Sequence, residues 1–171
     1  MTLSVLETRP KTDSNPDSPL GSDTRHALAD LVLNAVSDSY VLMVKTQAVH
    51  WNVTGPLFKS LHDLTEGQYQ DLFAAIDDLA ERIRALGLKA PMTYDGMQAA
   101  SEIEPFRTER PTAGDMIAEL AADNDKIAKR LILGIEAASR ETDPATEDIL
   151  TERLRAHQKA SWMLRAMLET A

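Results

Sequence analysis

The stretch that decides the fold runs from His50 to Gly87 and reads HWNVTGPLFKSLHDLTEGQYQDLFAAIDDLAERIRALG. It begins at the end of one helical pattern and breaks at Thr54-Gly55-Pro56. A long amphipathic pattern then continues to about Leu86, where Gly87 suits the C-terminus of a helix. The stretch therefore predicts two long helices joined by a tight turn.

Three further start signals predict the helices on either side of this stretch. Ser22 or Asp23 can cap a first helix that runs to about Asn52. The spacing of Thr112–Asp115 is that of a capping box that opens a third long helix. The run Thr142-Asp143-Pro144 predicts the start of a fourth, with proline at its first position.

The connections decide how the four helices are arranged. The first two and the last two helices are joined by short turns, which places them as neighbours in a four-helix bundle. The middle connection is longer, from Ala90-Pro91 to Pro111, and Tyr94–Ser101 predicts a short helix within it. The expected fold is all-α, a ferritin-like four-helix bundle with a short helix in the crossover between its second and third helices.

Composition limits the classes of function. The chain has 171 residues, 43% of them hydrophobic and 26% charged, with no cysteine and a net charge of −9. Disulfides, thiolate zinc sites and iron–sulfur clusters are therefore excluded, and the acidity argues against a protein built mainly to hold phosphate backbones. No signal-peptide pattern and no apolar run of membrane-spanning length is apparent, so we expect a cytoplasmic protein.

The first 21 residues are expected to form a flexible tail, and residues 22–171 the bundle. The tail contains three prolines and no periodic apolar stripe. Its positive side chains, Arg9 and Lys11, are balanced by Glu7, Asp13 and Asp17. A DNA-grasping arm needs more positive charge, so we expect an unspecialised segment.

Two pairs of polar residues share one broad side of the second helix. His62 and Glu66 are four residues apart, as are Asp77 and Glu81. At ~100° per residue, Asp77 lies only ~60° round the helix from His62, but at ~1.5 Å per residue it lies ~22 Å along the axis. One metal centre cannot take ligands from both ends of a straight helix, which leaves two independent sites or a second chain that supplies the missing half.

The second arrangement has a simple geometry. If two copies of this helix pack antiparallel about a two-fold axis near Asp71–Leu72, His62 and Glu66 of one copy meet Asp77 and Glu81 of the other. His50, just across the turn, can add a second imidazole. Imidazole with carboxylates and no sulfur suits iron(II), and also zinc or manganese. The alternative for each carboxylate alone is a solvated helix face.

These residues match the signatures of a known family. One pattern resembles the first signature of Dps, the ferritin-like proteins that protect DNA in starved cells. It reads His50-Trp51-x-Val53-x-Gly55, then, after five residues, Leu61-His62, and then, after three more, Glu66. The run Asp77-x-Leu79-Ala80-Glu81-Arg82, ending at Leu86-Gly87, resembles the second. The resemblance extends over about residues 24–170, including the region of Trp162.

The resemblance implies a homo-oligomer, a hollow dodecamer with di-iron or mono-iron ferroxidase centres at its two-fold dimer interfaces. Iron(II) is oxidised there, typically with hydrogen peroxide in preference to O2, and stored as ferric mineral, which protects DNA. It assigns His50, His62 and Glu66 to one subunit, and Asp77 and Glu81 to its partner. Many members have Asp where this chain has Glu66; the longer side chain should still bind metal but with altered affinity or occupancy.

Other residues have weaker assignments. Trp51, next to a ligand, is a candidate electron donor that quenches radicals, with core packing at least as good an explanation. Asp115, Glu119 and Asp123 form an acidic ridge on the third long helix, away from its apolar stripe, and are candidates for an iron-entry pore or a solvated face. His157 lies inside the apolar stripe of the last helix, which predicts a buried or interface histidine.

Three functions compete on the sequence alone. The first is a ferroxidase and iron-storage cage. The second is a non-enzymatic protein whose interfacial site holds zinc or manganese structurally. The third is a nucleoid-associated protein that compacts DNA and has a structural metal site. The balanced charge of the tail counts against the third, and we expect weak or no direct DNA binding at physiological salt.

Overall fold

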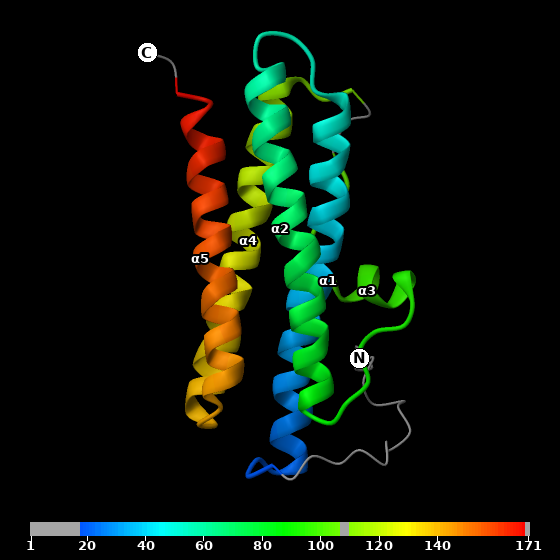
Figure 1. The fold of residues 1–171 in the computed structure, drawn as a ribbon, viewed down its shortest axis with the longest axis vertical. Helices are drawn as coiled ribbons and strands as arrows, with labels where there is room; N and C mark the ends of the chain where they lie inside the picture. The colour runs from blue at the N-terminus through cyan, green and yellow to red at the C-terminus, as the bar shows by residue number, and fades with distance from the viewer. Residues whose placement is uncertain (1–17, 107–109, 170–171) are drawn as a thin grey trace.

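The computed structural model describes residues 18–106 and 110–169. Its helices are α1 (Ser22–Asn52), α2 (Phe58–Ala85), α3 (Tyr94–Ala100), α4 (Ala113–Arg140) and α5 (Pro144–Ala166). The four long helices lie side by side, and the short α3 lies beside them in the connection between α2 and α4 (Figure 1). No strand occurs in the described residues. The predicted all-α bundle with a short crossover helix is confirmed.

The helix starts are mostly those that the sequence predicts. The Thr112 hydroxyl accepts a hydrogen bond from the Asp115 amide at 3.1 Å, and the Asp115 carboxylate accepts one from the Thr112 amide at 2.9 Å, which completes the capping box. Asp143 caps α5 through the Thr146 amide. The predicted cap of α1 is wrong: Gly21 is the N-cap residue and no side chain bonds there. Asp23 still lies in the first turn, where its charge favours the helix dipole.

Two glycines allow the turns around α2. Gly55 has φ +84° between α1 and α2, and Gly87 has φ +89° just after α2 ends. A residue with a side chain rarely adopts this left-handed backbone, so glycine lets α1 and α2 fold back on each other. The predicted break and C-terminus of α2 are therefore where the sequence places them.

The core lies between two closely packed pairs of helices, α1 with α2 and α4 with α5. Its apolar side chains come from all four long helices at three- and four-residue steps, as an amphipathic pattern predicts. The largest fully buried ones are Leu28, Leu42, Leu61, Leu79, Ile83, Leu86, Ile117, Leu120, Ile127, Leu150 and Leu164.

Buried ion pairs join elements that are far apart in the sequence. Asp38 of α1 accepts hydrogen bonds from Arg130 of α4 at 2.6 Å and from the Glu102 amide at 2.8 Å, which fixes the end of the crossover. Arg82 of α2 binds both carboxylate oxygens of Asp143, at 2.8 and 2.7 Å. The crossover and the start of α5 are thus anchored to the bundle.

One described helix is long and apolar enough to span a membrane by length and composition, namely α1. In this fold 61% of its apolar window is buried inside the bundle, as in the core helix of a soluble protein. The sequence predicts no apolar run long enough to span a membrane. That expectation is wrong for α1, which is long and apolar enough by length and composition. Residues 1–17 of the expected tail lie outside the described residues, so the division at residue 21 stays a prediction.

Candidate metal centre

His50 and His62 meet where α1 ends and α2 begins. Their imidazole rings stack with centroids 3.7 Å apart and an interplanar angle of 16°. His50 is in the last turn of α1 and His62 in the second turn of α2, so the Gly55 turn brings them together. Both side chains are half-buried. The structure therefore unites the two histidines that the sequence singles out.

Reciprocal hydrogen bonds fix the tautomer of both rings. Nδ1 of His50 donates to the backbone carbonyl of His62 at 2.9 Å, and Nδ1 of His62 donates to the carbonyl of His50 at 2.8 Å. A carbonyl oxygen can only accept, so each Nδ1 carries a hydrogen. Each neutral ring then has its Nε2 lone pair free for a metal. A histidine ligand usually has this second bond, which orients the ring.

Two aromatic residues extend the histidine pair. Phe58 stacks on His62 with ring centroids 5.1 Å apart, and Tyr69 meets the edge of His50 at 5.3 Å. Sequence reasoning missed both. A signal was present for Tyr69, because it follows His62 by seven residues and so lies on the same side of α2. Each of these rings packs against one of the two imidazoles and restricts its movement.

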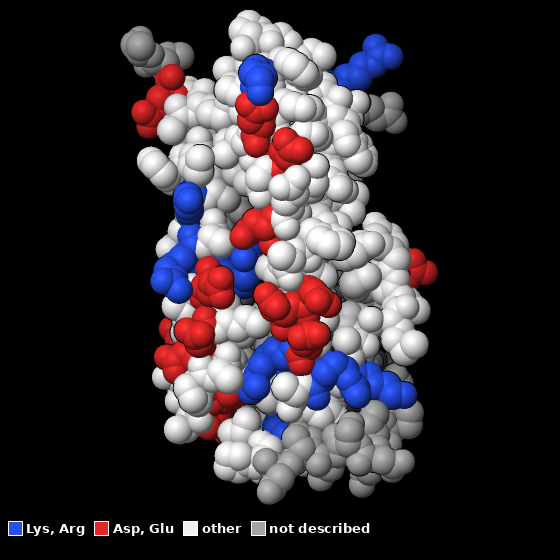
Figure 2. Space-filling model, in the orientation of Figure 1, with Lys and Arg blue, Asp and Glu red and all other residues white. Residues whose placement is uncertain are grey.

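The three candidate carboxylates are exposed on α2. Within the described residues, Glu66, Asp77 and Glu81 have no hydrogen bond or ion pair. Figure 2 shows acidic side chains spread along the face that α2 crosses. Carboxylates without a protein partner are available to bind a cation.

An exposed aromatic lies between the two ligand pairs. Phe73 is 71% exposed, and at ~100° per residue it lies within ~40° of both Glu66 and Asp77 round the helix. It is also close to Asp71–Leu72, the predicted position of a two-fold axis. The ring of Phe73 therefore lies where a second copy of α2 would cover it in the predicted two-fold pairing.

The structure does not bring all five candidate ligands together in one chain. No group of three or more His, Asp or Glu side chains able to hold a metal occurs in residues 18–106 and 110–169. His50 and His62 meet at one end of α2, and Asp77 and Glu81 lie near the other. The assignment of these five residues to a shared centre stays a prediction.

Trp51 does not belong to the core of the chain. Its side chain is 68% exposed, so core packing within this chain does not explain it. Trp51 follows His50 directly, and its exposure shows that the side chain points away from the bundle interior. Its role stays a prediction.

The expected acidic ridge on α4 is wrong in part. Asp115 is occupied by the capping box, and Lys45 of α1 forms ion pairs with Glu119 at 3.2 Å and Asp123 at 2.7 Å. Asp123 is only 8% exposed, and burial raises the pKa of its carboxyl group. The Asp123 side chain therefore faces the interior of the bundle, where the Lys45 ammonium group of α1 pairs with it. Asp123 therefore does not lie on a solvated face, and the role of the three residues in an iron-entry pore stays a prediction.

His157 is buried, as predicted, with 2% of its side chain exposed. Its Nδ1 lies 2.8 Å from the Asn124 side-chain oxygen. It lies in a different part of the bundle from His50 and His62, between α2 and α5.

Comparison with known proteins agrees with this architecture. The family model of the ferritin-like domain matches residues 29–171. The DNA protection during starvation protein 2 of Bacillus anthracis is 36% identical over 138 residues, covering 80% of this chain and 94% of that protein.

Solved structures give the same result. Dps from Thermosynechococcus elongatus matches with a TM-score of 0.83 and 27% identity, over 88% of this chain and 95% of that chain. The Dps protein of Vibrio cholerae O1, described as a member of a broad superfamily of ferritin-like diiron-carboxylate proteins, matches with a TM-score of 0.85 and 26% identity, over 94% and 100%. From the bundle, its crossover helix and these matches, the chain belongs to the Dps family of ferritin-like proteins.

Proposed function

We propose that this protein is a ferroxidase and iron-storage protein that oxidises iron(II), preferentially with hydrogen peroxide, at centres shared between two subunits. The observation that carries the proposal is the reciprocal hydrogen bonding of His50 and His62. Both bonds use Nδ1, so in each of the two stacked rings Nε2 is the nitrogen left with a lone pair for a metal ion. A pair of structural histidines needs no such arrangement, whereas metal ligands do.

The centre is completed by pairing of α2 with a second copy. An antiparallel partner places Asp77 and Glu81 of the partner subunit against His50, His62 and Glu66. Support comes from the unpartnered state of these carboxylates and from the exposed Phe73 between them. Two copies of Phe73 would meet near the axis and bury their rings, while a centre forms at each end.

The ligand charges favour the reaction. Three carboxylates stabilise iron(III) more than iron(II), because the electrostatic attraction grows with the charge of the ion. Two iron(II) ions give up one electron each, and hydrogen peroxide accepts both as its O–O bond breaks, which yields two iron(III) ions and two hydroxide ions. Trp51, exposed next to His50, is placed to give an electron to a radical that escapes the centre.

Storage and protection follow from this chemistry. A dodecamer built from such dimers would hold the ferric product as mineral in its cavity. Consumption of iron(II) and peroxide together lowers hydroxyl-radical formation and so protects DNA without requiring direct contact. The protein would act in the cytoplasm, with DNA binding weak at physiological salt.

The direct test is anaerobic addition of iron(II) to the purified protein, followed by hydrogen peroxide or O2, with the ferric absorbance recorded. We expect fast oxidation with peroxide, slower oxidation with O2, and loss of both in His62→Ala and Asp77→Ala. Asp63→Ala is a matched control, because Asp63 is an exposed α2 acid that pairs with Lys59.

Two outcomes would overturn the proposal. Equal oxidation rates in the wild type and both ligand variants would place the reaction elsewhere. Absence of a ferric signal, with zinc or manganese raising the melting temperature in a His62-dependent way, would identify a structural metal site instead.

A further inference from the structure

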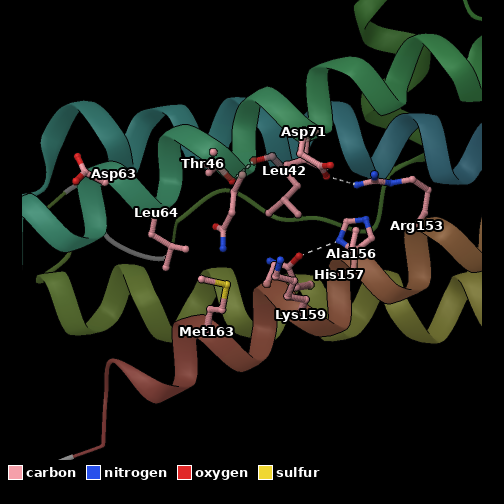
Figure 3. A pocket seen from close by; sticks show the side chains of 15 residues that line it. Leu42, Thr46, Asp63, Leu64, Asp71, Arg153, Ala156, His157, Lys159 and Met163 are labelled. Atoms are coloured by element: carbon pink, nitrogen blue, oxygen red, sulfur yellow. Dashed lines mark hydrogen bonds and ion pairs between the residues drawn. The ribbon is translucent and has the colours of Figure 1, made fainter.

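A half-open cavity of about 700 Å³ lies between α2 and α5 and reaches α1 at Leu42 and Thr46 and α4 at Asn124 (Figure 3). Neither His50 nor His62 lines it. Small residues leave this space: Gly67 on α2, and Ala156 and Ala160 on α5. A Cβ added at Gly67 would meet no atom within 4 Å. Apolar side chains, including Leu64 and Met163, form much of its wall. The volume is several times the ~150 Å³ of an engineered cavity that binds benzene.

His157 brings a hydrogen-bond acceptor to this cavity. The Asn124 side-chain NH2 donates to the Leu120 carbonyl at 2.8 Å, which leaves the Asn124 oxygen to accept from His157 Nδ1. Nε2 of His157 is thus a lone-pair acceptor, and it has no hydrogen-bond partner among the described residues. Burial lowers the pKa of His157 to about 3, so the ring is neutral at neutral pH.

Arg153 and Gln68 bring donors to the same cavity. Arg153 precedes His157 by four residues on one face of α5 and is 6% exposed. Its Nη2 donates to Asp71 at 2.7 Å, so its charge is already balanced, but its Nε has no partner in the described chain. The side-chain nitrogen of Gln68 is also without one. Figure 3 shows Arg153 and His157 next to each other on the wall, with Asp71 opposite Arg153.

From this arrangement we propose that the cavity binds a small neutral molecule with an apolar ring or chain and one hydroxyl group, of the phenol or alcohol class. The hydroxyl oxygen accepts a hydrogen bond from Arg153 Nε or Gln68, and its hydrogen is donated to His157 Nε2. The apolar body lies against Leu64 and Met163. A hydroxyl is suited because it both donates and accepts, and the charge of Arg153 beside it is already balanced by Asp71.

This site is separate from the proposed iron centre. Gln68 follows Glu66 by two residues and so lies ~200° round α2 from it. Most of the α2 residues that line the cavity therefore face a different side of the helix from Glu66, Asp77 and Glu81. Binding there needs neither iron nor the pairing of α2, and the two proposals can fail independently.

The test uses ¹⁹F NMR of 4-fluorophenol with the iron-free, full-length assembly. Ligand line broadening gives the affinity even for a large oligomer. 4-Fluoroanisole is the matched probe, because its methyl ether accepts a hydrogen bond but cannot donate one. We expect saturable binding of 4-fluorophenol and binding of 4-fluoroanisole weaker by about fivefold or more, the effect of one lost hydrogen bond.

Two variants locate the site by filling it from opposite walls, Gly67→Leu from α2 and Ala160→Leu from α5. Each is expected to weaken 4-fluorophenol binding by about tenfold or more, because the added side chain occupies the cavity. Gly21→Leu makes the same change at an open glycine outside the cavity and should bind as the wild type does. Circular dichroism and oligomer mass verify that the variants fold.

The proposal is overturned by any of three results. No saturable binding of 4-fluorophenol would mean that the polar groups serve water alone. Equal affinity for the two probes would remove the role of the hydroxyl. Unchanged binding in both folded filling variants would place the probe elsewhere.

Discussion

His50 and His62 each donate Nδ1–H to the other's backbone carbonyl while their rings stack 3.7 Å apart. The two hydrogen bonds join the end of α1 to the start of α2. The same bonds therefore hold the helices together and orient the rings. Neither ring can turn without breaking its bond and the stack. The two Nε2 atoms that we propose as metal ligands are therefore held in place before any ion arrives, which would lower the cost of binding.

The first prediction concerns acid stability and His157. Burial lowers its pKa from 6.5 to about 3, so the unfolded chain binds one more proton between these values. Stability therefore falls as the pH falls through this window, by up to about 1.4 kcal/mol per pH unit from this group. The slope of the unfolding free energy against pH, measured with urea, should be shallower in His157→Gln by that amount.

Other titratable groups contribute equally to the pH slopes of the wild type and of His157→Gln. Burial raises the pKa of Asp38 and Asp123, and hydrogen bonds lower those of Asp115 and Asp125, but all four are present in both proteins. Equal slopes for the wild type and His157→Gln between pH 6 and pH 4 would show that His157 is protonated in the fold.

The second prediction concerns the anchor of α5. Arg82→Ala leaves the Asp143 carboxylate, which is 5% exposed, without its guanidinium partner. Loss of one partner from a buried ion pair costs about 3 kcal/mol, so the urea midpoint should fall markedly. Lys59→Ala breaks the exposed Lys59–Asp63 pair and should change stability by no more than about 0.5 kcal/mol. Similar effects of the two changes would contradict the buried anchor.

The third prediction concerns Phe73. Because its ring is 71% exposed, Phe73→Asp should leave the fold of the chain intact, as seen by circular dichroism. At the proposed axis, however, it would bring two like charges together and remove apolar contact area. We expect a smaller oligomer by light scattering and a matching loss of iron oxidation. A variant that assembles and oxidises iron as the wild type does would rule out this face as the interface.

The fourth prediction concerns DNA. With a net charge of −9 and a tail of balanced charge, the protein should bind duplex DNA weakly and only at low salt. A gel shift repeated at rising salt measures this. Tight, stoichiometric binding that survives physiological salt would contradict the expectation.

Much of the fold could be predicted from the sequence because local signals agree with the packing. The Thr112–Asp115 capping box, the Asp143-Pro144 start and the Gly55 and Gly87 turns all depend on a few neighbouring residues. The start of α1 was harder, because Gly21 caps it without any side-chain bond.

The site was only half predictable. Spacing on α2 selects His62, Glu66, Asp77 and Glu81 as candidate ligands, since helix geometry relates residues within one element. It cannot show that His50 and His62 orient each other, or that Lys45 reaches Asp123, because these contacts join residues that are distant in the sequence. The cavity at His157 is likewise a product of packing between α2 and α5.

The central claim is that each iron centre uses His62 of one subunit and Asp77 of its partner. His62→Ala and Asp77→Ala should each be inactive alone, since every centre in either assembly lacks one ligand. If the two variants are co-assembled at random, about half of the dimers are mixed and each has one intact centre, so activity should return to about one quarter of the wild type. The measurement is the initial rate of peroxide-driven iron(II) oxidation by the mixed assembly, with mass spectrometry to verify mixing. Recovery to about a quarter is the predicted result, and a mixed assembly as inactive as either variant would contradict the shared centre.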